Sequence, residues 1–211
     1  MKQKTYLFDF DGTLVDSMGS YSKVMKKMLD DEGIKYGDDL IKIITPIGYK
    51  ATAEYFSSLG VKGSQEEILD KMLALLHYEY ANKIPAKEKV EQTLLKMKQS
   101  GVSINVLTAA PHFLLDCCLK RLNLFELFDN VWSCDDFKTG KNNPEIYRQV
   151  AKVLGKEVSD IVFVDDNFNA VKTAKIAGMK SIGIFDESSR EYIEEIKSVA
   201  DGYAYNFEEL Y

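Results

Sequence analysis

The sequence has no long apolar run. Nowhere in its 211 residues is there a stretch approaching the roughly 18 uncharged apolar residues that suggest a membrane-spanning helix. Near the start of the chain, the apolar stretch in YLFDFDG is broken by aspartates within a few residues, which fits neither a signal peptide nor a membrane span. We therefore expect a cytoplasmic protein with no membrane partner.

Cysteine and proline are also scarce, and acidic residues outnumber basic ones. The three cysteines, Cys117, Cys118 and Cys134, are odd in number and lack CxxC spacing, so we expect free, buried thiols in a reducing compartment. With four prolines and no Ser/Gly-rich run, no flexible linker is expected. The formal net charge of -6 argues against a nucleic-acid partner, because nucleic acids are bound through basic patches.

The composition is that of an ordinary globular chain. About 45% of the residues are hydrophobic and 28% are charged, which predicts a sizeable buried core. The length suits one domain, or one domain that carries a smaller insertion. We expect a monomer or a weak homodimer.

Short apolar runs of strand length alternate with helical patterns. This alternation predicts an α/β fold, a doubly wound, Rossmann-like parallel sheet. The expected strands are 5–8, 103–107, 130–133, 161–164, 181–185 and 202–205. The expected helices are 87–99, 111–122, 144–154, 167–177 and 189–199.

One interval interrupts the alternation. Between residues 17 and 83 no strand is expected, and the clearest helix runs from Gln65 to Tyr80 with Ser64 as its N-cap. This interval is too long for an ordinary crossover connection. We expect a helical cap at 17–83 that lies over the paired aspartates, and a core of 1–16 and 84–211. The alternative is a decorated crossover.

Polar residues follow several of the expected strands. Ligands of open α/β sheets bind beyond the carboxyl ends of the strands, so these residues are the first candidates for a site. They are Asp9 and Asp11, Thr108, Lys141, and the pair Asp165 and Asp166.

This set suits phosphoryl transfer. Clustered carboxylates repel one another unless a cation joins them, and Mg²⁺ prefers carboxylates together with phosphate oxygens and water. The nucleophile could be water or the carboxylate of Asp9, which would form an acyl phosphate. Asp11 is placed to protonate the leaving alcohol and then to activate water. Gly12 allows the backbone to turn close to the ligand.

The stretch DFDGTLVDS resembles the DxDx[TV] motif of the haloacid dehalogenase-like hydrolase superfamily. Thr108, Lys141 and the acidic pair follow in that superfamily's order, and the insertion resembles its C1-type cap. The resemblance, to phosphatases of the phosphoglycolate phosphatase and β-phosphoglucomutase-like groups, implies Asp9 as nucleophile and Asp11 as general acid/base. It also implies Mg²⁺ held by Asp9, the backbone carbonyl of Asp11 and Asp166, with Asp165 as a second acidic member.

Two positions depart from the superfamily's usual pattern. Many relatives have Gly-Asp followed four residues later by another aspartate, whereas here the acidic pair is adjacent and Ala170 stands at the later position. It is therefore left open whether Asp165 contacts the metal or only its waters. The usual Lys-Pro is Lys141-Asn142, for which little effect is expected.

Further residues are candidates for substrate binding. Gly48, Tyr49 and Lys50 form a turn and helix start that is expected to contact the leaving group, and Tyr21 is expected to face the same region. Ala109, beside Thr108, is expected to take part in substrate binding as well. His77 and His112 lack partners at metal-ligand spacing and are interpreted as structural.

The predicted function is Mg²⁺-dependent hydrolysis of a small phosphate ester through an aspartyl-phosphate on Asp9. Three alternatives differ from it at specific features of the chain. Metal-independent dehalogenases lack an equivalent of Asp11. A β-phosphoglucomutase-like mutase typically carries a histidine where Tyr21 stands. A receiver-like signalling module would place its acidic pair on the first strand and would have no helical insertion.

Overall fold

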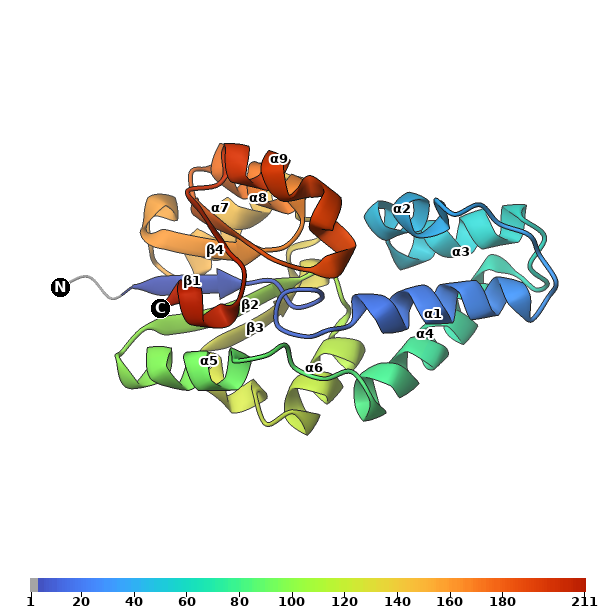
Figure 1. The fold of residues 1–211 in the computed structure, drawn as a ribbon, viewed down its shortest axis with the longest axis horizontal. Helices are drawn as coiled ribbons and strands as arrows, with labels where there is room; N and C mark the ends of the chain where they lie inside the picture. The colour runs from blue at the N-terminus through green and yellow to red at the C-terminus, as the bar shows by residue number, and fades with distance from the viewer. Residues whose placement is uncertain (1–3) are drawn as a thin grey trace. The chain divides into compact units, whose positions relative to one another are not determined.

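The computed structural model describes residues 4–211, and within them the strands form one sheet (Figure 1). Its strand order is β3-β2-β1-β4-β5-β6, and every pairing of neighbours is parallel. The strands are β1 (Thr5–Phe8), β2 (Ser103–Thr108), β3 (Asn130–Ser133), β4 (Ile161–Asp165), β5 (Lys180–Ile184) and β6 (Gly202–Ala204). The predicted doubly wound α/β fold is confirmed.

Helices cover both faces of this sheet. Figure 1 shows α5 and α6 on one side of it and α7, α8 and α9 on the other. The helices are α5 (Val90–Gln99), α6 (His112–Arg121), α7 (Pro144–Val153), α8 (Phe168–Ala177) and α9 (Ile193–Val199). The short 3-10 helices are η2 (Phe125–Leu127), η3 (Cys134–Phe137), η4 (Val158–Asp160), η5 (Glu187–Tyr192) and η6 (Phe207–Leu210).

The central strands are buried because each of their faces packs on another layer. Leu7 and Phe163 belong to the same buried cluster as Tyr147 of α7 and Ala174 of α8. On β1 the next residue, Phe8, stacks on Phe207 of η6, with the ring centroids 5.8 Å apart. Alternate side chains of one short strand therefore enter two apolar layers, which explains why its sequence is a continuous apolar run.

A helical insert separates β1 from β2, as predicted. It consists of α1 (Met18–Asp30), α2 (Leu40–Ile44), the 3-10 helix η1 (Thr45–Ile47), α3 (Gly48–Ser58) and α4 (Gln65–Asn82). The insert buries apolar faces of its own, with Met25 and Met28 of α1, Phe56 of α3 and Met72 of α4 all inaccessible to solvent. The insert therefore has its own hydrophobic core.

Residue contacts divide the chain into two compact units. One comprises the residues up to Asp16 together with Pro85–Tyr211, and the other comprises Ser17–Ile84. The sequence predicted a cap domain at 17–83 and a core domain of 1–16 and 84–211. Whether these units are separate domains stays a prediction. Within residues 4–211, no helix is both long enough and apolar enough to cross a membrane.

The strand order bears on the signalling alternative. The order 3-2-1-4-5-6 is that of Rossmann folds, whereas flavodoxin-like folds, to which receivers belong, have the order 2-1-3-4-5. The helical insert after β1 is also foreign to receivers. The fold therefore argues against a receiver-like module.

Two predicted helices begin later than their sequence patterns suggested. The helix expected from residue 87 begins at Val90, because Lys89 adopts a left-handed conformation with φ of 68° and the preceding segment pairs with the turn after β1. The helix expected from residue 189 is the 3-10 helix η5 as far as Tyr192. There the Asp186 side chain accepts a hydrogen bond from Ser188 N and so caps a tighter turn.

The N-terminus of α4 provides a test of local stability. Ser64 Oγ accepts a hydrogen bond from Glu67 N, and the Glu67 carboxylate accepts one from Ser64 N, which forms a capping box. We expect Ser64→Ala to lower the free energy of unfolding by about 1 kcal/mol in urea titrations. Glu67→Gln, which keeps an acceptor, is the control and should cost less than half as much. An equal loss in both variants would contradict the assignment.

Candidate active site

Asp9 lies directly after β1, beside the end of β4. Its backbone N–H donates a 2.9 Å hydrogen bond to Val164 O, which extends the pairing of the two strands by one residue. Asp165 is the last residue of β4 and is fully buried, and Asp166 follows it with only 7% of its surface exposed. The parallel register thus brings carboxylates from β1 and β4 to the same edge of the sheet.

These three aspartates form a compact cluster. Asp9, Asp165 and Asp166 each offer a carboxylate oxygen within 4.8 Å of the others. Burial raises the pKa of Asp165 above its usual range, the Lys141 ammonium lowers it by less, and Asp9 raises it further. Burial, and then the charges of Asp165 and Asp9, likewise raise the pKa of Asp166. The cluster therefore concentrates negative charge where water cannot screen it.

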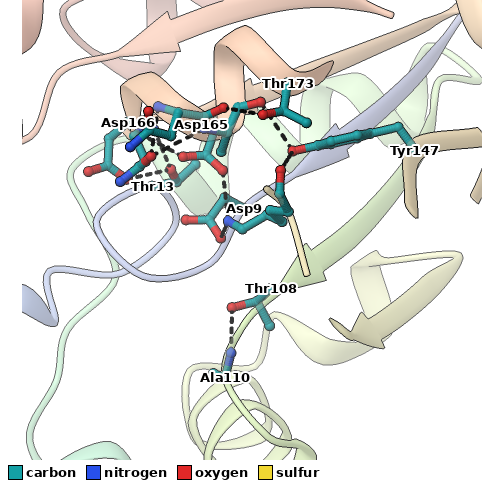
Figure 2. A network of polar contacts seen from close by, with 12 residues as sticks. Asp9, Thr13, Thr108, Ala110, Tyr147, Asp165, Asp166 and Thr173 are labelled. Carbon is teal, nitrogen blue, oxygen red and sulfur yellow. Dashed lines mark hydrogen bonds and ion pairs between the residues drawn. The ribbon is translucent and has the colours of Figure 1, made fainter. Parts of the chain in front are cut away.

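Lys141 is the cation paired with this cluster. Its Nζ donates hydrogen bonds to Asp9 Oδ1 and, at 2.7 Å, to Asp165 Oδ2 (Figure 2). Burial lowers the pKa of Lys141, but Asp165 and Asp9 raise it by more, so the ammonium stays charged. The Tyr147 hydroxyl, on α7, contacts both Lys141 O and Ala170 O at 3.1 Å, which holds the backbone at Lys141 against α8.

Asp165 is held from two sides. Its Oδ2 accepts from Lys141, and its Oδ1 accepts a 2.7 Å hydrogen bond from Asn167 N. Asn167 in turn caps α8, accepting hydrogen bonds from Asn169 N and Ala170 N. The orientation of Asp165 therefore follows from the start of the next helix.

The turn after β1 packs against Asp166. Thr13, which is fully buried, donates its hydroxyl to Asp166 Oδ1 and accepts from Asp166 N, both at 3.2 Å. Gly12 has φ of +79°, and a Cβ on it would lie 2.8 Å from Asp166 Oδ1. Glycine is therefore required both by the backbone conformation and by the close approach of the carboxylate.

This donor set fits a hard divalent cation. Lys141 pairs with two of the three buried carboxylates, and an excess of buried negative charge is costly unless a further cation compensates it. Oxygen ligands of this kind suit Mg²⁺. Asp9, Asp165 and Asp166 are thus the residues that could hold a metal.

Thr108 occupies the end of β2, where the sequence predicted it. Its hydroxyl accepts a 3.1 Å hydrogen bond from Ala110 N, and Figure 2 shows this pair apart from the aspartates. Thr108 is buried and Ala109 is exposed. Their contacts with a ligand stay predictions.

The roles of the remaining candidates also stay predictions. Asp11 is half-buried in the turn after β1, and its side chain is outside the carboxylate cluster. In the insert, Gly48 has φ of +77° at the start of α3, and Tyr49 and Lys50 follow in the first turn. The Tyr21 ring meets that of Tyr49 edge-on at 6.4 Å.

The cysteines and His112 have structural roles. Burial raises the pKa of Cys118 to about 12 and that of Cys134 to about 11, so these thiols stay protonated and unreactive. The His112 ring bridges two carboxylates, with Nδ1 3.1 Å from Asp116 and Nε2 2.9 Å from Asp136. It connects the first turn of α6 to η3.

Sequence reasoning missed several residues that shape the site. Thr13 could have been found, because it is the fifth residue of the matched DxDx[TV] motif. Asn167 has an N-cap signal before α8. Tyr147 and Lys87 had no such signal, because their partners lie far away in the sequence.

Comparison with known proteins shows the family to which the chain belongs. The family model for haloacid dehalogenase-like hydrolases matches residues 3–178. The chain belongs to this family of hydrolases, and its insert after β1 is like a C1 cap. The resemblance inferred from the DFDGT motif is confirmed.

Individual relatives share less than a third of their residues with this chain. The chain is 28% identical to pyrophosphatase PpaX of Bacillus velezensis, over 84% of this chain and 81% of that protein. It is 26% identical to validoxylamine A 7'-phosphate phosphatase of Streptomyces hygroscopicus subsp. limoneus, over 91% and 90%. The crystal structure of a predicted phosphoglycolate phosphatase from Haemophilus somnus 129pt has a TM-score of 0.80 at 18% identity and covers 100% of this chain and 97% of its own.

The His112 bridge predicts a pH dependence of stability. Burial lowers the pKa of His112, but its hydrogen bonds to Asp136 and Asp116 raise it by more, so the folded-state pKa lies above the ordinary value. The stabilisation is therefore complete below the unfolded-state pKa of about 6.5 and is lost as pH rises through the folded-state pKa.

We expect the unfolding free energy of wild type to exceed that of His112→Gln by more at about pH 5.5 than at about pH 8.5. The excess should be at most about 1 kcal/mol, because the ring is partly exposed and its pairs are screened. Asp116→Asn, which removes one partner, should reduce the pH dependence. A difference that is constant with pH would contradict the bridge.

Gly12 predicts a loss specific to the cluster. Gly12→Ala should cost about 1–2 kcal/mol of stability through its backbone conformation. We expect Mg²⁺ to raise the unfolding temperature of the wild type by binding the cluster, and Gly12→Ala should abolish that rise because Asp166 must move. Gly101 has a similar φ of +75°, and a Cβ on it would meet nothing within 4 Å. Gly101→Ala should therefore lose similar stability but keep the Mg²⁺ effect, and an equal Mg²⁺ effect in both variants would refute the prediction.

Proposed function

We propose that this hydrolase is a Mg²⁺-dependent phosphatase of a small phosphorylated metabolite. The observation that carries the proposal is the buried cluster of Asp9, Asp165 and Asp166, paired with Lys141 at the carboxyl ends of β1 and β4. The relatives named as a pyrophosphatase and a validoxylamine 7'-phosphate phosphatase support a phosphorylated substrate.

The residues fit the metal unequally. Both carboxylate oxygens of Asp165 already accept hydrogen bonds, from Lys141 and Asn167 N. We therefore expect Asp9, Asp166 and the backbone carbonyl of Asp11 to be the direct ligands, with Asp165 orienting Lys141. When bound, Mg²⁺ neutralises phosphate oxygens and supplies charge stabilisation in the transition state.

The chain's own residues carry the two chemical steps. In the first, a carboxylate oxygen of Asp9 forms a bond to phosphorus while the bond to the leaving oxygen breaks, and Asp11 gives its proton to that oxygen. In the second, water adds to the phosphorus of the aspartyl-phosphate, Asp11 takes the water's proton, and Asp9 is released as a carboxylate with inorganic phosphate.

Lys141 and Thr108 serve the phosphoryl group. The Lys141 ammonium keeps the Asp9 carboxylate in one orientation and carries positive charge toward the transferring group, where negative charge develops on the equatorial oxygens. The Thr108 hydroxyl, already oriented by Ala110 N, is free to donate its proton to a phosphate oxygen.

Substrate choice is assigned to the insert. Gly48, Tyr49, Lys50 and Tyr21, together with Ala109 of the core, are proposed to contact the leaving group. The proposed binding partner is a small phosphate ester, and neither a nucleic acid nor a membrane is proposed. The proposed oligomeric state is a monomer or a weak homodimer.

Purified protein should release phosphate from at least one member of a panel containing pyrophosphate, sugar phosphates and phosphoglycolate. Activity should need Mg²⁺ and be lost with chelator. Asp9→Asn should lower kcat by more than about a thousandfold, because the nucleophile is removed. Asp16→Asn, at an exposed aspartate of the same stretch, is the matched control and should retain activity.

Rapid quenching, borohydride reduction and peptide mapping should locate the phosphoryl group on Asp9. Undiminished turnover with chelator, or an active Asp9→Asn, would refute the proposal. Conversion of a sugar 1-phosphate into its 6-phosphate without release of phosphate would instead support the mutase alternative.

A further inference from the structure

Lys87 lies in the segment that follows the helical insert. This segment pairs with the turn after β1. Lys87 N donates to Leu14 O, and Asp16 N donates to Pro85 O, both at 3.0 Å. Between them Val15 and Ala86 form an antiparallel bridge. The returning chain is therefore hydrogen-bonded to the same turn that carries Asp11 and Gly12.

Beyond this backbone pairing, the Lys87 ammonium is surrounded by three oxygen acceptors. Its Nζ donates to Gly12 O at 2.7 Å, to Phe185 O, and to Asp186 Oδ2 at 3.0 Å. These acceptors satisfy all the protons of an ammonium. Only 19% of the Lys87 side chain is exposed. The free-energy cost of removing this cation from water is offset by its hydrogen bonds.

Asp186 is itself held in place. It is 5% exposed, and its Oδ1 accepts hydrogen bonds from Ser188 N at 2.9 Å and from Ser188 Oγ at 2.6 Å. The anchor of the Lys87 ammonium is therefore a fixed carboxylate, and not a mobile surface residue.

The strand order makes this contact important for the site. β4, which ends in Asp165, lies between β1 and β5 in the sheet. Gly12 follows β1, and Phe185 and Asp186 follow β5, so the Lys87 ammonium joins the two strands that flank the acidic pair. The tolerance is small, since a Cβ added to Gly12 would lie only 2.8 Å from Asp166 Oδ1.

We propose that Lys87 is a positioning residue, which holds the turn at residues 10–15 against Asp166 so that the aspartate cluster keeps the geometry that binds a divalent cation. The proposal rests on the metal site of the proposed function, but it can be tested without turnover. The hydrogen bonds of the Lys87 ammonium go to Gly12, Phe185 and Asp186, so Lys87 acts on the cluster through Gly12.

Charge and position predict opposite effects on metal binding. At a pH at which the three aspartates are ionised, removing a positive charge near them would, by electrostatics alone, tighten Mg²⁺ binding. Releasing the turn would weaken it, and the loss of an outer-shell partner typically lowers metal affinity by about 10–100-fold. The sign of the change therefore separates the two roles.

The experiment is calorimetric titration of the whole chain with Mg²⁺ at a pH at which the three aspartates are ionised. Lys87→Met should weaken Mg²⁺ binding by about tenfold or more. Lys98→Met is the matched control. Lys98 pairs with Asp129 at 2.6 Å, and Asp129 precedes β3, at the opposite end of the strands from the aspartate cluster. This variant should change the Kd for Mg²⁺ less than twofold. Lys87→Gln, which keeps N–H donors, should have an intermediate effect and replaces Lys87→Met should that variant not fold.

An unchanged or tighter Kd in folded Lys87 variants would overturn the proposal. Hydrogen exchange adds a readout that needs neither metal nor substrate: amides of residues 11–15 should lose protection in Lys87→Met and keep it in Lys98→Met. An active Asp9→Asn would refute the proposed function and leave these Lys87 results intact, so the two failures are distinguishable.

Discussion

Three buried carboxylates repel one another at the carboxyl edge of the sheet, and the surrounding core is built to hold them together. Asp9 and Asp165 share the Lys141 ammonium, while Asp166 is held by Thr13. Leaving such charge in a dry site costs free energy unless cations compensate it. The same excess charge that burdens the fold is what makes the cluster suitable for a divalent cation and a transferring phosphoryl group.

The backbone around this cluster has little freedom to move. Gly12 has no room for a side chain, because the Asp166 carboxylate occupies that space. The turn is bound on its outer side by the segment that returns from the insert and by the Lys87 ammonium. A site assembled from separate strands is thus made rigid by contacts between residues distant in sequence.

Much of the fold could be predicted because its signals are local. A strand buried on both faces must be apolar throughout, so β1 and β4 stand out in the sequence, and the capping box at Ser64 marks the start of α4. Two helix starts were predicted too early. At Lys89 a left-handed residue, and at Asp186 a side-chain cap, stopped a helical pattern that hydrophobic periodicity alone would extend.

The sequence by itself determined the chemistry on offer: which strand ends carry a carboxylate, a hydroxyl or an ammonium, and in what order, because residue type and strand pattern are local properties. Only the tertiary structure decided which of these groups meet. That Lys141 pairs with Asp9 rather than solvent, that Thr13 holds Asp166, and that Lys87 joins the ends of β1 and β5 depend on strand order and register. Those are set by packing of the whole sheet, which no short motif encodes.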